Sequence, residues 1–254
     1  MRIDILTAFP GMFAGPLDES MIKRARERGL ADVRVHDLRA FTTDRHRTID
    51  DYAYGGGSGM VLKPEPIFEG VRAIRQQIED GQTSRTILLS PRGTPYTQQT
   101  AKTLAQADHL VLICGHYKGV DERVVEGLGV EEWSIGDYVL TGGELPAMVV
   151  IDSVVRLIPG VLSDIESATG DSFYDGLLDC PYYTRPECFE GMRVPDMLLS
   201  GHHQQIRRWR RLESLRATFA RRPDLLDECA LSDEDRELLN TLIERKDVDF
   251  HEPD

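Results

Sequence analysis

Three apolar segments of this 254-residue chain lead into loops that carry glycine or proline, with helical patterns between and after them. Residues 86–90 and 110–114 have this form, and so does a short apolar strand held between glycines in the run 131–146. Strands that alternate with helices build a mainly parallel sheet, and ligands collect at the carboxyl ends of its strands. The chain is therefore predicted to be an α/β protein with a ligand site at one edge of the sheet. The alternative is that the glycines only make tight turns.

The rest of the chain continues the alternation and then changes character. Further strands are predicted over 2–9 and 33–36, helices from after Gly11 to about 28, over 64 to about 80, over 98–107 and over 147–157, and a glycine-rich polar loop over 44–60. A polar segment over 161–176 is predicted to link this domain, 1–160, to a second domain over 177–254 that is rich in helical patterns. Two domains are therefore expected.

Composition limits the class of protein. With 41% hydrophobic and 29% charged residues, the chain can bury a substantial core. It has no apolar stretch of the ~18 residues that a membrane span needs, and Asp4 interrupts the first apolar run, so neither a membrane anchor nor a signal peptide is expected. The four cysteines lack Cys-x-x-Cys spacing and are expected to be reduced thiols, with no metal site. These features predict a cytoplasmic protein.

The distribution of charge qualifies the net charge of −13, which by itself argues against a nucleic-acid partner. Seven arginines and one acid lie between His203 and Arg222, a local charge of +6, whereas residues 223–254 carry −9. Distant exposed charges are screened over ~8 Å at ordinary salt, so a local basic stretch can bind a polyanion. A helical pattern is predicted on this arginine-rich stretch, and the alternative for its arginines is a solvated helix face.

Short motifs follow one another almost from end to end of the chain. They are Phe9-Pro10, Asp44-Arg-His-Arg-Thr, Tyr54-Gly-Gly-Gly-Ser-Gly-Met, Leu89-Ser-Pro, Cys114-Gly-His-Tyr-Lys-Gly-Val-Asp-Glu-Arg, residues 131–146, Ile151-Asp-Ser, Ile158-Pro-Gly-Val-Leu, Asp171-Ser-Phe, Gly176-Leu-Leu-Asp-Cys-Pro, Tyr183-Thr-Arg-Pro and Ile206-Arg-Arg-Trp-Arg. In this order they resemble the bacterial tRNA (guanine-N1)-methyltransferases of the SPOUT class. Any one motif would be weak evidence, but the whole series is specific.

The resemblance implies a fold and partners that no local pattern could show. It implies a deep trefoil knot in the sheet domain, which wraps S-adenosyl-L-methionine as the methyl donor, although knots are nearly absent among proteins. It also implies a homodimer, with each active site shared between the knot of one subunit and the linker and C-terminal helices of the other. The implied reaction is methylation of guanine N1 at position 37 of tRNA, immediately 3′ of the anticodon. No DNA or membrane partner is expected.

Two residues match the catalytic positions of the family. Guanine N1 carries a proton at neutral pH, so methylation there needs a base, and Asp171 matches that base. Arg156 matches the cation that would stabilise negative charge developing on guanine O6. The alternatives are a solvated or capping acid for Asp171 and an ion pair with Asp152, one helical turn away, for Arg156.

Binding residues are implied in the same way. For the methyl donor they are Pro91, Gly115, Tyr117, Ile135, Gly136, Asp137, Tyr138, Val139, Leu140, Gly142 and Gly143, and for the tRNA substrate they are Arg45, His46, Gly57, Gly59, Ser172, Asp179, Arg207, Arg208 and Arg210. Glycines leave backbone groups open to a ligand, and the glycines of the loop 54–60 could admit a flipped base. Arginines bind phosphates and so position the RNA. The alternatives are core packing for the apolar members and helix capping for Ser172 and Asp179.

Three residues depart from the pattern of the family. His116, Lys118 and Arg92 stand where Arg, Glu and Gln are expected. A carboxylate at position 118 would help to bind an amino group or a magnesium ion, so Lys118 leaves Mg²⁺ as an open alternative. The rival functions are ribose 2′-O methylation by another SPOUT enzyme and noncatalytic RNA binding. A nicotinamide-dependent oxidoreductase lacks its fingerprint, because Met60 stands where Gly-x-Gly-x-x-Gly requires its last glycine.

Overall fold

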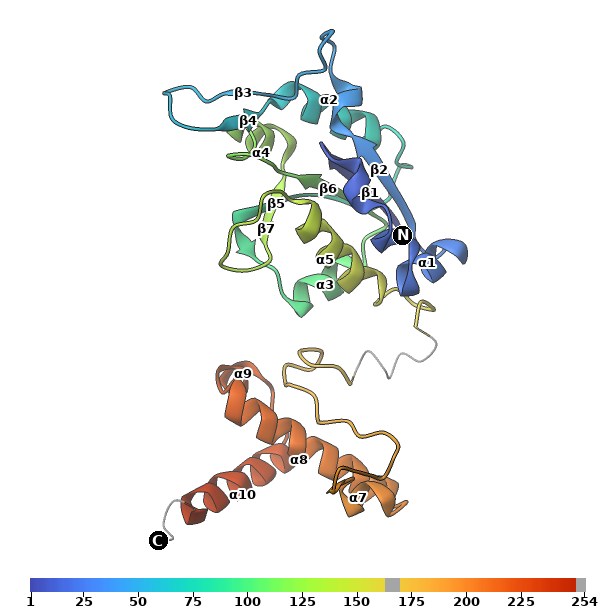
Figure 1. The fold of residues 1–254 in the computed structure, drawn as a ribbon, viewed down its shortest axis with the longest axis vertical. Coiled ribbons are helices and arrows are strands. Elements are labelled where there is room, and N and C mark those ends of the chain that lie inside the picture. The colour runs from blue at the N-terminus through green and yellow to red at the C-terminus, as the bar shows by residue number, and fades with distance from the viewer. Residues whose placement is uncertain (163–169, 250–254) are drawn as a thin grey trace. The chain divides into compact units, whose positions relative to one another are not determined.

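The protein divides into two compact units (Figure 1). In the computed structural model, which describes residues 1–162 and 170–249, these are the N-terminal unit, Met1–Ile165, and the C-terminal unit, Glu166–Asp254. The predicted linker over 161–176 falls partly on residues 163–169, which lie outside the described residues. None of the helices within the described ranges is long and apolar enough to cross a membrane.

The N-terminal unit is built on a five-stranded parallel sheet, which confirms the predicted α/β class. In the order of their pairing, the strands are β2 (Asp32–Asp37), β1 (Arg2–Thr7), β6 (His109–Cys114), β5 (Ser84–Pro95) and β7 (Glu131–Ser134). Every residue of β6 is buried, as a central strand covered on both faces requires. The carboxyl ends of β5, β6 and β7 therefore meet at one edge of the sheet.

Helices cover both faces of this sheet (Figure 1). Helices α1 (Ser20–Glu27), α3 (Gln98–Leu104) and α5 (Glu144–Val155) pack on one face, and α2 (Pro64–Arg75) and α4 (Glu122–Leu128) pack on the other. Leu110 and Leu112 of β6 join the first core, whereas Val111 and Ile113 join the second. This division follows from the two-residue period of a strand, whose successive side chains point to opposite faces.

The helix predicted from after Gly11 to about 28 is wrong over its first half. Two 3-10 turns, η1 (Pro10–Phe13) and η2 (Pro16–Asp18), precede α1, and a third, η3 (Leu38–Phe41), follows β2. Gly15 has φ of 96°, which lies outside the helical region, and Pro16 follows it. These two residues stop a helix from extending through the segment.

The predicted end of β5 at residue 90 is also wrong, because β5 pairs with β7 on both sides of an irregularity. Trp133 of β7 pairs with both Leu89 and Thr94, so residues 90–93 form an irregularity and β5 then continues to Pro95. Two further differences lie in the loops. The segment 44–60, predicted as a loop, contains β3 (Asp50–Tyr52), which pairs with β4 (Met60–Leu62). The strand expected between the glycines of 131–146 lies earlier in the sequence, because β7 ends before Gly136.

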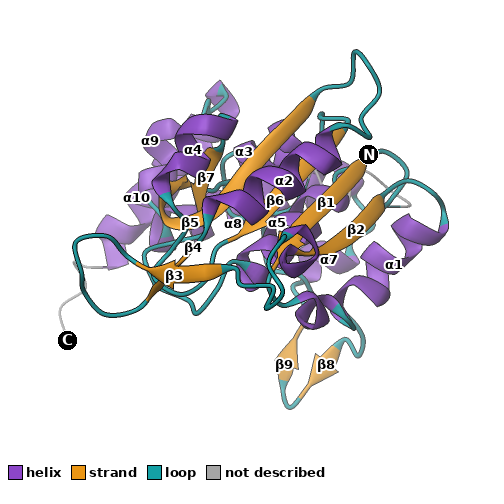
Figure 2. Ribbon diagram, turned by 90° about the horizontal axis from the view of Figure 1, so that it is seen from above, coloured by secondary structure: helices purple, strands orange, loops and turns teal. Residues whose placement is uncertain are grey.

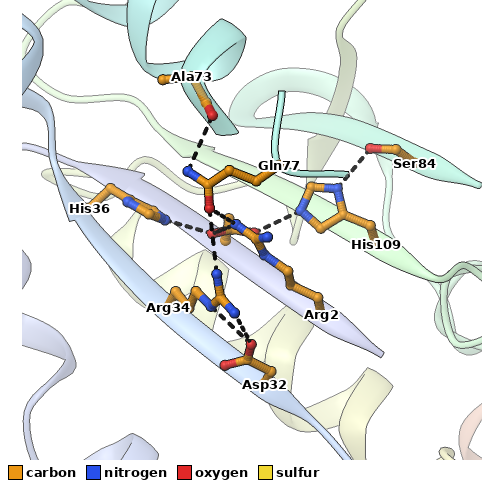
Figure 3. A network of polar contacts seen from close by, with 9 residues as sticks. Arg2, Asp32, Arg34, His36, Ala73, Gln77, Ser84 and His109 are labelled. Atoms are coloured by element: carbon orange, nitrogen blue, oxygen red, sulfur yellow. Dashed lines mark hydrogen bonds and ion pairs between the residues drawn. The ribbon is translucent and has the colours of Figure 1, made fainter. Parts of the chain in front are cut away.

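A polar network crosses the sheet toward the amino ends of β1, β6 and β5, away from the edge where the carboxyl ends of β5, β6 and β7 meet (Figure 3). The carboxylate of Asp4, fully buried in β1, accepts hydrogen bonds from Arg2 (2.6 and 3.0 Å), His36 of β2 (2.6 Å) and His109 of β6 (2.7 Å). The other ring nitrogen of His109 lies 2.9 Å from the hydroxyl of Ser84 in β5. Burial alone would raise the pKa of Asp4, but the hydrogen bonds from His109, His36 and Arg2 together hold that pKa well below its usual range.

The described part of the C-terminal unit begins with a non-helical stretch over 170–187, which is followed by one small hairpin and four helices. It contains β8 (Cys188–Phe189), β9 (Met192–Arg193), α7 (Asp196–Leu199), α8 (His203–Arg221), α9 (Asp224–Glu228) and α10 (Asp233–Asp249). Figure 2 shows the β8–β9 hairpin as two short arrows. The core of the C-terminal unit is a cluster of four buried leucines, Leu177, Leu215, Leu238 and Leu242. The helix predicted on the arginine-rich stretch is confirmed as α8.

Candidate functional site

A pocket of about 240 Å³ lies where the carboxyl ends of β5, β6 and β7 meet. Its walls come from the segments 88–92, 115–120 and 132–143, together with Pro146. They include ten of the eleven residues predicted to bind the methyl donor: Pro91, Gly115, Tyr117, Ile135, Gly136, Tyr138, Val139, Leu140, Gly142 and Gly143. Asp137 is exposed and does not line this strand-end pocket. Three loops from distant parts of the sequence thus share one site.

Two glycines let the backbones around the pocket approach one another. A Cβ at Gly143 would lie 2.8 Å from Cα of Cys114 and 2.9 Å from the nitrogen of Gly115, and the Gly143 N–H donates to the Gly115 carbonyl at 2.7 Å. A Cβ at Gly93 would lie 2.5 Å from the carbonyl carbon of Glu132. Because these obstacles are backbone atoms, no side-chain movement could relieve them.

The loop after β6 is held in place by the short β4 strand. The N–H of Lys118 donates to the Met60 carbonyl, that of Leu62 to Gly119, and that of Asp121 to Leu62, each at 3.0 Å. The same hairpin carries Gly57 and Gly59 in its connection, which extends away from the sheet in Figure 2, and every residue from 51 to 59 is exposed. The pocket wall and the glycine-rich loop are therefore directly connected through backbone hydrogen bonds.

Charged groups gather at the same end of the sheet. Arg92 lies 2.8 Å from Glu122 of α4 and 3.5 Å from Glu132 of β7, and hydrogen bonding to Glu122 together with the charge of Glu132 raises the pKa of Arg92. Burial raises the pKa of the Cys114 thiol well above its usual value, and the charge of Glu144 raises it further. The thiol thus stays protonated, and a cysteine nucleophile does not fit this site.

The remaining predicted residues lie outside the pocket lining. Arg156 is the C-cap residue of α5 in the N-terminal unit, whereas Asp171 belongs to the C-terminal unit. Ser172 donates a hydrogen bond to Asp179 at 2.6 Å, and the N–H of Asp179 donates back to the Ser172 hydroxyl at 2.9 Å.

The basic residues predicted to contact tRNA are all on the surface. Arg45 and His46 are exposed before β3, in the segment where Asp44 accepts hydrogen bonds from the N–H groups of His46 and Thr48. Arg207, Arg208 and Arg210 are exposed on α8.

Sequence reasoning missed several residues of this site. His116 and Trp133 line the pocket, and Glu144 lies buried behind its wall. His116 was noticed only as a departure from a motif. The available signal for Glu144 was an acid directly after Gly142 and Gly143 at the start of an apolar helix, where a carboxylate also meets the positive end of the helix dipole.

Comparison with known proteins gives one consistent result. The sequence model of the family described as tRNA (guanine-1)-methyltransferase TrmD matches residues 1–228. A tRNA (guanine-N(1)-)-methyltransferase from Geobacillus kaustophilus is 58% identical over 239 residues, which cover 94% of this chain and 97% of the relative. Proteins of the same name from Dictyoglomus turgidum (56% identical over 242 residues, 95% of this chain and 96% of the relative) and Brevibacillus brevis (56% over 246 residues, 97% and 100%) are also similar over nearly the full length. The chain therefore belongs to the tRNA (guanine-1)-methyltransferase family.

Proposed function

We propose that this protein transfers a methyl group from S-adenosyl-L-methionine to N1 of the guanine at position 37 of tRNA, immediately 3′ of the anticodon. The observation that carries the proposal is the glycine-walled pocket at the strand ends, in a chain that belongs to this family. The pocket supplies a place for the donor, and the arginine-rich helix α8 supplies a surface for RNA.

The strand-end pocket suits a compact, folded ligand with both polar and apolar parts. Its volume of about 240 Å³ lies just below the ~300–1,000 Å³ of drug-sized ligand sites. Backbone at Gly115, Gly136 and Gly142 can bind adenine and ribose edges, while Ile135 and Leu140 supply apolar walls. Bound there, the donor would supply an electrophilic methyl carbon on a sulfonium centre.

The protein's chemical task is then to prepare the guanine. We assign Asp171 as the base that removes the N1 proton, and Arg156 as the cation beside O6 that stabilises the charge left by that proton. Arg156 follows the last turn of α5, whose first turn adjoins the pocket wall at Gly143 and Pro146. Ser172 and Asp179, joined by two hydrogen bonds, would hold the donor's ammonium group or line the guanine site.

The tRNA would be held by groups from both units. Arg207, Arg208 and Arg210 on α8 would position phosphates, without reading the sequence. Arg45, His46, Gly57 and Gly59 would lie on the substrate side, where the exposed loop leaves room for a flipped base.

The proposal includes an architecture and an assembly. The sheet domain, 1–160, would carry the trefoil knot that the family resemblance implies. The linker 161–176 would join it to the tRNA-binding domain 177–254. Two subunits would form a cytoplasmic homodimer with shared active sites.

One assay tests the reaction. Labelled S-adenosyl-L-methionine is incubated with tRNA transcripts that carry guanine or adenine after the anticodon, and the modified atom is mapped. Label on N1 of the guanine alone is expected. Label on a ribose 2′ oxygen would favour the sister SPOUT activity, and binding without label would favour a noncatalytic RNA-binding protein. Repeating the assay with a chelator tests the role of Mg²⁺.

The catalytic assignments have their own test. Asp171→Ala is expected to abolish methylation while donor affinity stays near the wild-type value, because the base does not contact the donor's adenosine. Asp227→Ala, at an exposed acid of α9, is the matched control and should remain active. Full turnover by Asp171→Ala would remove the base assignment. For Arg156→Ala, an unchanged single-turnover rate would remove the O6 assignment.

A further inference from the structure

A buried carboxylate lies directly behind the wall of the strand-end pocket. Glu144, the first residue of α5, is 1% exposed, and its Oε1 accepts a hydrogen bond from the Thr7 hydroxyl at 2.7 Å. That hydroxyl also accepts the N–H of Phe9 at 2.9 Å, so the end of β1 fixes one side of the carboxylate. The second oxygen, Oε2, is buried and has no hydrogen-bond partner among the residues that the structure describes. Such a group is costly to leave unsatisfied.

The nearest candidate partner is the imidazole of His116. Its Nδ1 is also buried, has no hydrogen-bond partner within the described part of the chain, and lies 3.8 Å from Oε2 of Glu144. The ring is packed between Phe9, at 4.5 Å between centroids, and Tyr117, at 4.8 Å. A charge-assisted N–H to carboxylate bond is roughly 2.7–2.9 Å long, so a movement of about 1 Å would satisfy both groups.

The glycine between them makes this approach feasible. A Cβ at Gly142 would lie 2.5 Å from Nδ1 of His116 and closer still to Oε2 of Glu144. Gly142 also forms an antiparallel backbone bridge with His116. Any larger residue at 142 would occupy the space that the imidazole and the carboxylate need. The chain thus keeps a donor and an acceptor facing each other within the pocket wall.

We propose that Glu144 is a positioning residue that accepts the Nδ1–H of His116 when the pocket is filled. Between the two neutral tautomers of the imidazole, this contact selects the one whose Nε2 carries the lone pair. With Nδ1 committed to Glu144, Nε2 is the ring nitrogen left for the pocket, and it accepts a hydrogen bond from an amino or hydroxyl group of an adenosine-containing ligand. The inference rests on the proposed function, because it gives the methyl donor this contact.

The first experiment uses the wild-type protein. It is labelled with ¹⁵N-histidine and bound to S-adenosylhomocysteine, the demethylated product, and the resonances of His116 are identified by their loss in His116→Gln. A neutral ring protonated at Nδ1 is expected. A ring protonated at Nε2, or at both nitrogens, would overturn the proposal without any variant that must fold.

The second experiment is a double-mutant cycle on S-adenosylhomocysteine affinity, measured by calorimetry. Glu144→Gln removes the charge that selects the tautomer and is expected to weaken binding about tenfold, with the loss in turnover falling on KM for the donor rather than on kcat. In a His116→Ala background the same substitution should cost almost nothing, since Glu144 then has no imidazole to orient. An equal loss in both backgrounds would show that Glu144 acts by another route.

The outcomes separate this inference from the proposed function. If S-adenosylhomocysteine does not bind the wild-type protein at all, the methyl-donor site and the inference fail together. If it binds and tRNA is methylated, but the tautomer or the cycle contradicts the expectation, only the role of Glu144 fails. Thermal stability of each variant, followed by fluorescence of Trp133 in a Trp209→Phe background, identifies a loss that comes from unfolding.

Discussion

Replacing Asp4 by Asn should destabilise the N-terminal unit strongly. The substitution keeps the size of the side chain but removes a negative charge that is fully buried. It also places an amide NH₂ where one oxygen accepts a hydrogen bond from an imidazole. Arg2, His36 and His109 then lose part or all of the acceptor that they share, and at least one of them faces a donor (Figure 3).

The size of the effect follows from burial. Removing one partner of a buried ion pair costs about 3–5 kcal/mol, because the remaining charge has no compensation. In a unit of about 165 residues, each kcal/mol lowers Tm by about 2–4 °C, so a decrease of about 6–20 °C is expected. The matched control is Asp32→Asn on the neighbouring strand, whose carboxylate is 54% exposed and pairs with Arg34. An exposed pair of this kind contributes about 0.2–1 kcal/mol.

The same group makes the unit sensitive to acid. The pKa of Asp4 is lowered in the folded state, so its contribution to stability is fully present above the unfolded-state pKa, near 3.8. That contribution is lost as pH falls below about 4, because the unfolded chain binds the proton more readily. Asp4→Asn should therefore reduce the slope of stability against pH in this acid range.

Urea unfolding with a reporter confined to one unit provides the assay. The chain has two tryptophans, Trp133 in the N-terminal unit and Trp209 in the C-terminal unit, so Trp209→Phe leaves fluorescence that reports only the former. Unfolding free energies are compared for Asp4→Asn and Asp32→Asn in this background, at pH 7 and at pH values below 4. Equal losses for the two variants at pH 7 would refute the reasoning, since burial would then make no difference.

Two further substitutions test the pocket wall and the C-terminal unit. Position 143 has a backbone conformation that alanine can adopt, with φ of −81°, but the methyl group of Gly143→Ala would meet the backbone of Cys114 and Gly115. A loss of about 1–3 kcal/mol in stability and weaker binding of S-adenosylhomocysteine are therefore expected. The control Gly11→Ala, at a glycine with open space around it, should change neither quantity. In the C-terminal unit, hydrogen bonds from Arg211 lower the pKa of Asp235 to about 2, so about 2 kcal/mol of stability should disappear as pH falls from about 4 toward 2. The unfolding of Asp235→Asn is followed by Trp209 fluorescence in a Trp133→Phe background, and an unchanged dependence of stability on pH would contradict this expectation.

The alternation of apolar strands and helical patterns was enough to predict a parallel α/β sheet, and the glycine-bearing loops were enough to place a site at its edge. Both signals are local, since a strand and its terminating loop are neighbours in sequence. The order of short motifs also identified the family, and the local charge of α8 predicted a basic helix. Nothing local indicated α4 or the continuation of β5 to Pro95, because that continuation depends on pairing with Trp133 of a different strand.

Tertiary structure alone decided which polar side chains meet. Asp4 and His109 are 105 positions apart, and Thr7 and Glu144 are 137 apart, yet both pairs form buried hydrogen bonds. Considered alone in the sequence, each of these residues is an ordinary acid, hydroxyl or imidazole within an apolar strand or next to an apolar strand. Whether such a buried polar group destabilises or stabilises the fold depends on the register of the sheet, because the register brings its hydrogen-bond partner within 3 Å. The sequence by itself therefore determined the class of fold, the family and the edge of the sheet at which the pocket lies. The packing of distant strands determined which polar groups are buried together, both in the Asp4 network within the sheet and in the Thr7–Glu144 pair beside the pocket.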